Sequence, residues 1–151
     1  MTSAIIGAVT AVILVFLIIA WLLYRRTTDL YRFRRAQGQQ LIEYIRWIFC
    51  RKGYTLSAVK YVSDKQAEAI IVKNSVATMV QIRQRRSKVP RTMIKFLYNT
   101  ALKADCDWAV LICPAGFTKD AYKLAREYGI TLYDGRWLSN VLKGCRLKFT
   151  A

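Results

Sequence analysis

The sequence predicts an α/β domain, built as a mixed sheet flanked by helices, behind one N-terminal transmembrane helix. Two observations lead to this prediction: an uncharged apolar run over residues 4–24, and a series of helix and strand patterns over residues 38–144. The order of the domain's elements is α-β-β-β-α-β-α-β-α, and elements in such an order form a sheet with helices on both faces. A chain of 151 residues has room for one modest domain and an anchor.

The apolar run over residues 4–24 has the length and composition of a retained membrane span. It contains no charged residue, and at about 1.5 Å per residue a helix of this length crosses roughly 30 Å of bilayer hydrocarbon. Trp21 and Tyr24 lie near its C-terminal end, where amphipathic rings favour the headgroup region. A cleaved signal peptide begins with cations and ends at small residues, whereas bulky residues here continue up to Arg25.

The arginines after the apolar run predict the orientation of the chain. Because cytoplasmic flanks of membrane helices are rich in Lys and Arg, we expect a single-pass protein of the cytoplasmic (inner) membrane, with its N-terminus outside and its domain in the cytoplasm. We divide the chain into an anchor (1–24), a basic juxtamembrane segment (25–37) and the domain (38–151). The juxtamembrane segment fits a short amphipathic helix on anionic lipid or, as the favoured alternative, a helical extension of the anchor.

The charge balance predicts an anionic partner. The chain has 25 Lys and Arg against 9 Asp and Glu, a net charge of +16, and no charge precedes Arg25. A field of that sign favours nucleic acid, an acidic lipid surface or an acidic protein. Plain membrane-proximal positive charge is the alternative that needs no ligand.

Residue types exclude several chemistries. The absence of His removes His-based acid–base catalysis and the Ser-His-Asp and Cys-His nucleophiles. The four cysteines form no C-x-x-C pair, which disfavours a zinc ribbon or a redox motif. Buried free thiols in a reducing compartment are the expected state.

Apolar spacing and turn residues define the elements of the domain. Residues spaced as on one face of a helix, with Gly53, Pro90, Thr118 and Gly129 at helix ends, predict helices over 38–54, 91–106, 117–129 and 136–144. Runs of strand formers predict strands over 54–62, 107–114 and 130–135. A hairpin is predicted over 67–84, with a tight turn at Lys73, Asn74 and Ser75.

Two phrases flank this hairpin and give the domain a family resemblance. The opening helix has the pattern Gly38, Leu41, Ile42, Ile45, Ile48, Phe49, Gly53 and Tyr54. The later phrase has the pattern Phe117, Thr118, Ala121, Ala125, Ile130, Leu132, Asp134, Gly135 and Leu138. With the element order, these phrases resemble the Mrr-type restriction endonuclease domain of the PD-(D/E)xK nuclease superfamily over about residues 38–143. The resemblance implies a restriction-endonuclease-like fold.

The resemblance also implies where a nuclease site would lie. In that family an acidic residue on the second strand and an acid or Gln on the third strand help to hold Mg²⁺, and a Lys two positions later balances charge at the phosphate. The matching positions here are Glu68 (or Ala69 if the hairpin turn is one residue shorter), Gln81 and Arg83.

Departures from the family pattern predict that these catalytic positions are degenerate and inactive. In that family a Glu on the opening helix often assists. Its position here is Ile42, and the adjacent Glu43 points about 100° away on a helix. Mg²⁺ requires hard oxygen ligands, and one carboxylate with one amide offers a weak site. Arg83 stays protonated, so it binds phosphate but replaces a catalytic ammonium poorly. We therefore expect no metal and no cofactor, with Mg²⁺ only if the protein is an active nuclease.

A plainer interpretation of Glu68 and Gln81 stands beside this one. Both residues would be ordinary strand residues at a sheet edge, and they would pair with Arg83 or Lys73.

A run of cations follows the hairpin, and no acidic residue lies between Glu68 and Asp105. Its members are the predicted nucleic-acid-binding residues Arg83, Arg85, Arg86, Lys88, Arg91 and Lys95. A solvated face is the alternative, but an uncompensated run repels itself and is more natural against a polyanion.

Three functions follow from these observations. The favoured one is a membrane-anchored, non-catalytic nuclease-like domain that binds nucleic acid phosphates. The second is a structural docking subunit of a multi-protein membrane complex, such as DNA-handling or secretion machinery. The third is an active Mg²⁺-dependent DNA endonuclease. The oligomeric state stays open.

Overall fold

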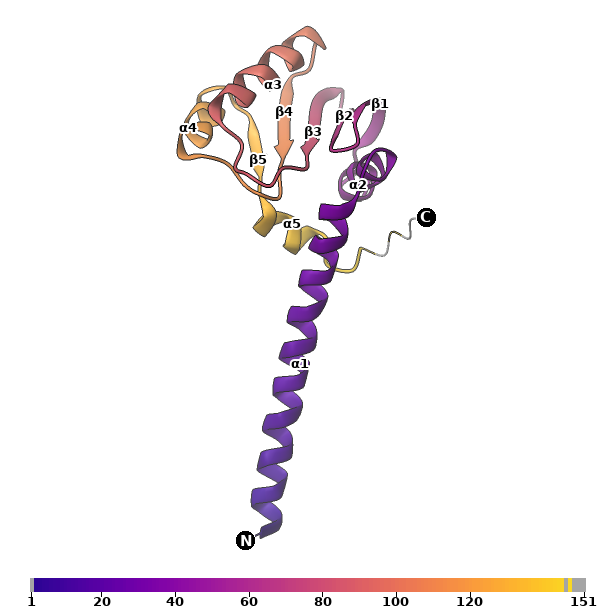
Figure 1. Ribbon diagram of the computed structural model, residues 1–151. Coiled ribbons are helices and arrows are strands. Elements are labelled where there is room, and N and C mark those ends of the chain that lie inside the picture. The colour runs from indigo at the N-terminus through magenta and orange to yellow at the C-terminus, as the bar shows by residue number, and fades with distance from the viewer. Residues whose placement is uncertain (1, 146, 148–151) are drawn as a thin grey trace.

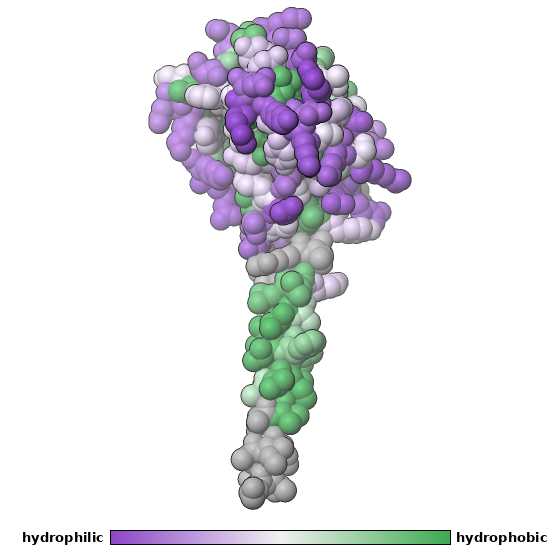
Figure 2. Space-filling model, turned by 90° about the vertical axis from the view of Figure 1, so that its left-hand side faces the viewer, coloured by the Kyte–Doolittle hydropathy of each residue, from purple (hydrophilic) through white to green (hydrophobic). Residues whose placement is uncertain are grey.

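A computed structural model describes residues 2–145 and 147, and it describes side chains for 9–24, 29–60, 62–145 and 147. One long helix, α1 (Thr2–Arg35), extends away from a domain that contains all the other elements (Figure 1). The apolar stem of α1 lies below a domain with a hydrophilic surface (Figure 2).

The domain is organised around a five-stranded sheet with the order β1-β2-β3-β4-β5. Antiparallel pairing joins the first three strands, and β3, β4 and β5 pair in parallel. The strands are β1 (Thr55–Ser63), β2 (Gln66–Lys73), β3 (Val76–Arg83), β4 (Trp108–Ile112) and β5 (Thr131–Tyr133). The predicted mixed sheet and element order are therefore confirmed.

Helices cover both faces of this sheet. One apolar core joins the sheet to α2 (Gln39–Cys50) and α5 (Gly135–Val141), and a second joins it to α3 (Arg91–Lys103) and α4 (Lys119–Glu127). Side chains of a strand alternate between the two faces, and β3 and β4 contribute buried residues to both cores. The predicted helices on both faces are confirmed.

Local residues produce the turns and helix starts that the sequence predicted. Asn74 and Ser75 have φ of 52° and 65°, the positive values that a two-residue hairpin turn needs at both central positions. The Thr118 hydroxyl accepts a hydrogen bond of 3.2 Å from the Ala121 amide and so caps α4. The Asp134 carboxylate caps α5 in the same way, with bonds of 3.0 and 3.1 Å from the amides of Arg136 and Trp137.

The C-terminal end of α1 is part of the domain. Phe33 is fully buried in the core of α2 and α5, and its ring meets the Tyr44 ring edge-on at 4.9 Å between centroids. The Gln84 side-chain amide donates a 2.5 Å hydrogen bond to the Phe33 carbonyl. The helix is continuous through residues 25–35, so the structure has the favoured helical extension rather than a separate amphipathic helix.

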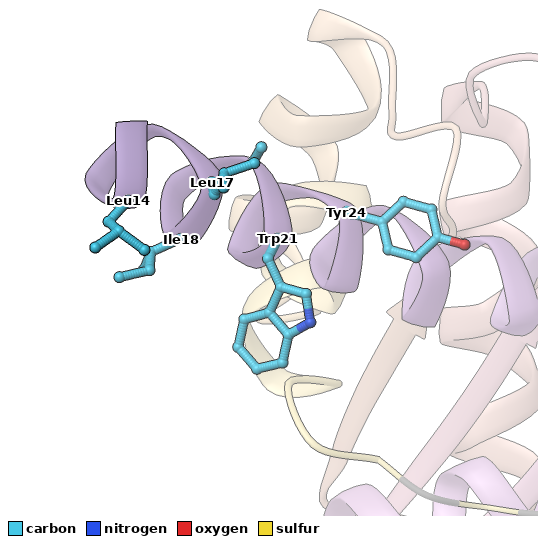
Figure 3. Close-up of a pocket in the computed structure, with 6 residues that line it drawn as sticks. Leu14, Leu17, Ile18, Trp21 and Tyr24 are labelled. Carbon is cyan, nitrogen blue, oxygen red and sulfur yellow. The ribbon is translucent and has the colours of Figure 1, made fainter. Parts of the chain in front are cut away.

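The stem of α1 has no buried side chain among its described residues, 9–24. Its apolar side chains there are exposed, for example Phe16 at 74%. Leu14, Ile18 and Trp21 project from the same side of the helix (Figure 3). By length and composition, α1 is the one helix of the described residues that is apolar enough to cross a membrane, with a mean hydropathy of 2.0 in its apolar window.

Candidate functional site

The predicted site residues lie together on two interior strands. Glu68 on β2 faces Gln81 on β3 directly, and Gln66 faces Arg83 in the same register. Residues opposite each other, and residues two apart on one strand, share a face of the sheet. This is the face covered by α3 and α4, because Met79, two residues before Gln81, belongs to their core.

A chain of hydrogen bonds joins these side chains. The Glu68 Oε1 atom accepts from Nε2 of Gln81 and, at 3.2 Å, from Nε2 of Gln66. The Arg83 Nε atom donates to Oε1 of Gln81 at 2.8 Å. Gln81 is fully buried and Glu68 is 7% exposed. Both side chains need hydrogen-bond partners, because a buried polar group without one is costly.

The plainer interpretation of Glu68 and Gln81 is confirmed in one pairing, since Gln81 accepts a hydrogen bond from Arg83, and it is wrong about the sheet edge and about Lys73. Strands β2 and β3 lie inside the sheet order, so neither residue is at a sheet edge. Glu68 hydrogen-bonds to two amides instead of pairing directly with Arg83. Lys73 lies at the other end of β2, where its Nζ atom donates to the Lys52 carbonyl at 2.6 Å.

Arg83 is half-buried between the network and helix α3. Burial lowers the pKa of its guanidinium, and the opposing charge of Glu68 raises it. The guanidinium carbon also lies 5.9 Å from the centroid of the Phe96 ring. Arg83 therefore links the buried network to the surface of α3.

Two oxygen atoms at this site are already engaged by donors. Oε1 of Gln81 accepts from the Arg83 guanidinium and Oε1 of Glu68 accepts from two amides, whereas Mg²⁺ takes nearly octahedral oxygen ligands. Glu43 lies on α2, which packs on the opposite face of the sheet, and its Oε1 atom is 3.8 Å from Nη1 of Arg46. Among the described residues, no group of three or more Asp, Glu, Cys or His residues could hold a metal ion.

The predicted basic residues continue from this site onto the surface. Arg85, Arg86 and Lys88 are exposed in the loop after β3, and Arg91 and Lys95 are exposed on the first turns of α3. Within the described part of the chain, the ion pair of Glu43 and Arg46 is the one salt bridge. These five cations therefore have no carboxylate partner there. Hydrophilic side chains cover the side of the domain on which α4 lies (Figure 2).

Three residues at this site escaped the sequence prediction. Gln66 belongs to the hydrogen-bond network, Lys60 faces Glu68 from β1, and the exposed Phe96 lies beside Arg83. The place of Lys60 opposite Glu68 depends on the register between β1 and β2, which shifts at two points, whereas Gln66 lies two residues before Glu68 on the same strand. The sequence did indicate that Phe96 is exposed, because it lies between Ile94 and Leu97, which are core positions of the helix.

A model of the Mrr_cat family, described as restriction endonuclease, matches residues 33–142. The chain belongs to this family. The match begins at Phe33, the residue at which α1 enters the core. No curated protein matches the sequence significantly.

One solved structure shows a similar fold at low sequence identity, and two others have a weaker likeness. A protein of unknown function, AF1548, is 14% identical with a TM-score of 0.53, over 70% of this chain and 68% of that one. EndoMS in apo form is 11% identical with a TM-score of 0.48, over 62% of this chain and 44% of that one. The DNA modification-dependent restriction endonuclease AspBHI is 10% identical with a TM-score of 0.45, over 82% and 36%. The match thus spans less than half of the EndoMS and AspBHI chains.

Proposed function

We propose that this member of the restriction endonuclease family is a membrane-anchored domain that binds nucleic acid phosphates through its basic face without cleaving them. One observation supports this most strongly: the family's site positions hydrogen-bond to one another, and the cations beside them have no carboxylate partner among the described residues. The site thus keeps its charge for phosphate and has few oxygen atoms free for a metal.

The loss of catalysis follows from the role of Gln81. Its amide nitrogen donates to Glu68 and its amide oxygen accepts from Arg83. A metal ion would need that oxygen together with a free carboxylate, and it would compete with the charge of Arg83. Glu68, Gln81 and Arg83 are therefore degenerate catalytic positions with a structural role.

The binding of phosphate follows from the exposed cations. Lys and Arg that meet phosphates release counterions, so their affinity falls steeply with salt and depends little on sequence. The residues proposed to bind are Arg83, Arg85, Arg86, Lys88, Arg91 and Lys95. No cofactor takes part.

The membrane anchor is the exposed stem of α1. Lipid would cover the apolar side chains that the chain leaves exposed between Val9 and Tyr24. Because α1 is continuous and ends in the core at Phe33, the domain would be held about 14 Å beyond Tyr24 by nine residues of helix. We place residues 1–24 in the cytoplasmic membrane, with the N-terminus outside and the domain in the cytoplasm.

Binding to full-length protein in nanodiscs of zwitterionic lipid tests this proposal. Labelled DNA and RNA should bind at low salt, and the double variant Arg85→Glu with Arg86→Glu should lose this binding. The double variant Lys123→Glu with Arg126→Glu is the control, since it makes the same change of charge at exposed positions of α4. No binding by the unmodified protein, or equal losses in the two double variants, would refute phosphate binding by the loop.

A docking role is the second candidate, and two exposed apolar side chains of the domain support it. Leu102 and Trp108 are 58% and 57% exposed, and burial of exposed apolar side chains of this size against a partner is favourable. A docking subunit would co-purify in detergent with stoichiometric partners that survive nuclease treatment. A monomeric extract would refute this role.

A further inference from the structure

Helix α3 presents one aromatic ring to solvent. Phe96 is 53% exposed, whereas its neighbours Ile94 and Leu97 are fully buried in the core of α3 and α4. A single exposed apolar residue is ordinary on protein surfaces, so exposure alone assigns no role to this ring. Its surroundings do.

The ring lies where the buried network meets the basic surface. The guanidinium carbon of Arg83 is 5.9 Å from its centroid. Lys95 precedes Phe96 and points about 100° away from it on the helix, and Arg91 is exposed five residues earlier. The other face of Phe96 has no aromatic or cationic partner among the described contacts. An open ring beside the Arg83 guanidinium, on a helix that also carries the exposed cations Arg91 and Lys95, is therefore part of this surface.

This combination suits an unpaired base. Proteins bind single strands by cations that hold the backbone and by aromatic rings on which bases stack. A base in a duplex is stacked on both faces by its neighbours, so it has no free face for the ring. A stacked base would also keep its phosphate within reach of the adjacent cations.

We infer that Phe96 stacks an unpaired base and that the preferred ligand of the basic face is single-stranded nucleic acid. This inference rests on the phosphate binding proposed above and names the substrate class of the same surface.

The test compares single-stranded and duplex DNA of matched length, bound to full-length protein in zwitterionic nanodiscs. Phe96→Ala should weaken single-strand binding about 5- to 150-fold, the range measured for loss of one stacked base, and should leave duplex binding unchanged. Phe96→Tyr keeps a ring and should retain the single-strand binding of the unmodified protein. Leu102→Ala is the matched control, because Leu102 is equally exposed on the same helix and should have no effect.

The outcomes separate this inference from the function on which it rests. Unmodified protein that binds neither form refutes both. Unmodified protein that binds while Phe96→Ala behaves like Leu102→Ala refutes the stacking role alone. Equal losses for single-stranded and duplex DNA also refute it, because a ring that only supports Arg83 would affect both forms. Circular dichroism of each variant confirms that the fold is intact.

Discussion

Strand β3 has a different chemistry on each of its two faces. Toward α2 it presents Val80 and Ile82, both fully buried in an apolar core. Toward α3 it presents Met79, then Gln81 and Arg83, so the apolar side chain gives way to polar ones along the strand. One face stabilises the fold and the other forms the site. Catalytic residues on the second face can therefore change while the fold persists on the first.

The largest expected effect is on the apolar face. Ile82→Ala removes a fully buried side chain, and the cavity should lower the free energy of unfolding by about 2–5 kcal/mol. Thermal unfolding of the full-length protein in detergent measures this loss. Val59→Ala, at a 44% exposed position of β1, should change stability by less than about 0.5 kcal/mol. Equal effects in the two variants would contradict the assignment of this face as the core.

A smaller effect is expected from the polar face. Glu68→Ala leaves the buried Gln81 amide without its acceptor, which should cost about 1–3 kcal/mol of stability. Glu43→Ala removes a half-exposed carboxylate and should cost less than about 1 kcal/mol. Unfolding curves of both variants measure this difference. If Glu68→Ala proved as stable as the unmodified protein, the network would not stabilise the hairpin.

Alkaline pH should weaken the core where α1 enters it. Burial raises the pKa of Tyr44 to about 12, from about 10 in an unfolded chain. The neutral phenol is the buried form, so its contribution to stability is complete below pH 10 and is lost as the pH rises toward 12. Tyr44→Phe should lose less stability over that interval than the unmodified protein. Parallel pH curves would show that another group dominates.

The smallest effects concern the salt dependence of binding. Arg85→Ala removes one phosphate contact and should lower the slope of log affinity against log salt by about one. Arg83→Lys keeps the charge and should leave that slope unchanged, although it loses the hydrogen bond from Nε to Gln81. Titrations at several salt concentrations measure both slopes. A change of slope in Arg83→Lys would show that the guanidinium does more than supply charge.

The sequence predicted the fold well because the fold depends on local signals. Helical spacing, strand alternation, the turn at Asn74 and Ser75 and the cap at Thr118 all appear in the structure as predicted. The position of Phe33 in the core was not foreseen. A Phe among arginines fits an interfacial helix equally well, and only the packing against Tyr44 distinguishes the two.

The site was predicted less completely because it depends on contacts between strands. The sequence suggested Glu68, Gln81 and Arg83 as neighbours, but the place of β2 and β3 inside the sheet was not readable from it. The pairing of Lys60 with Glu68 depends on a register with two shifts. The contact between Arg83 and Phe96 requires the packing of α3 on the sheet.

The most direct test of the account incubates supercoiled plasmid with the purified full-length protein in nanodiscs, with Mg²⁺ and separately with Mn²⁺. Retention on the protein and integrity of the plasmid are recorded from the same sample. We predict plasmid that is retained at low salt, released at high salt and fully intact under both metals. Nicked plasmid that disappears with a chelator and with Glu68→Ala would contradict the account, because it would show that the residues around Glu68 still assemble a working metal site.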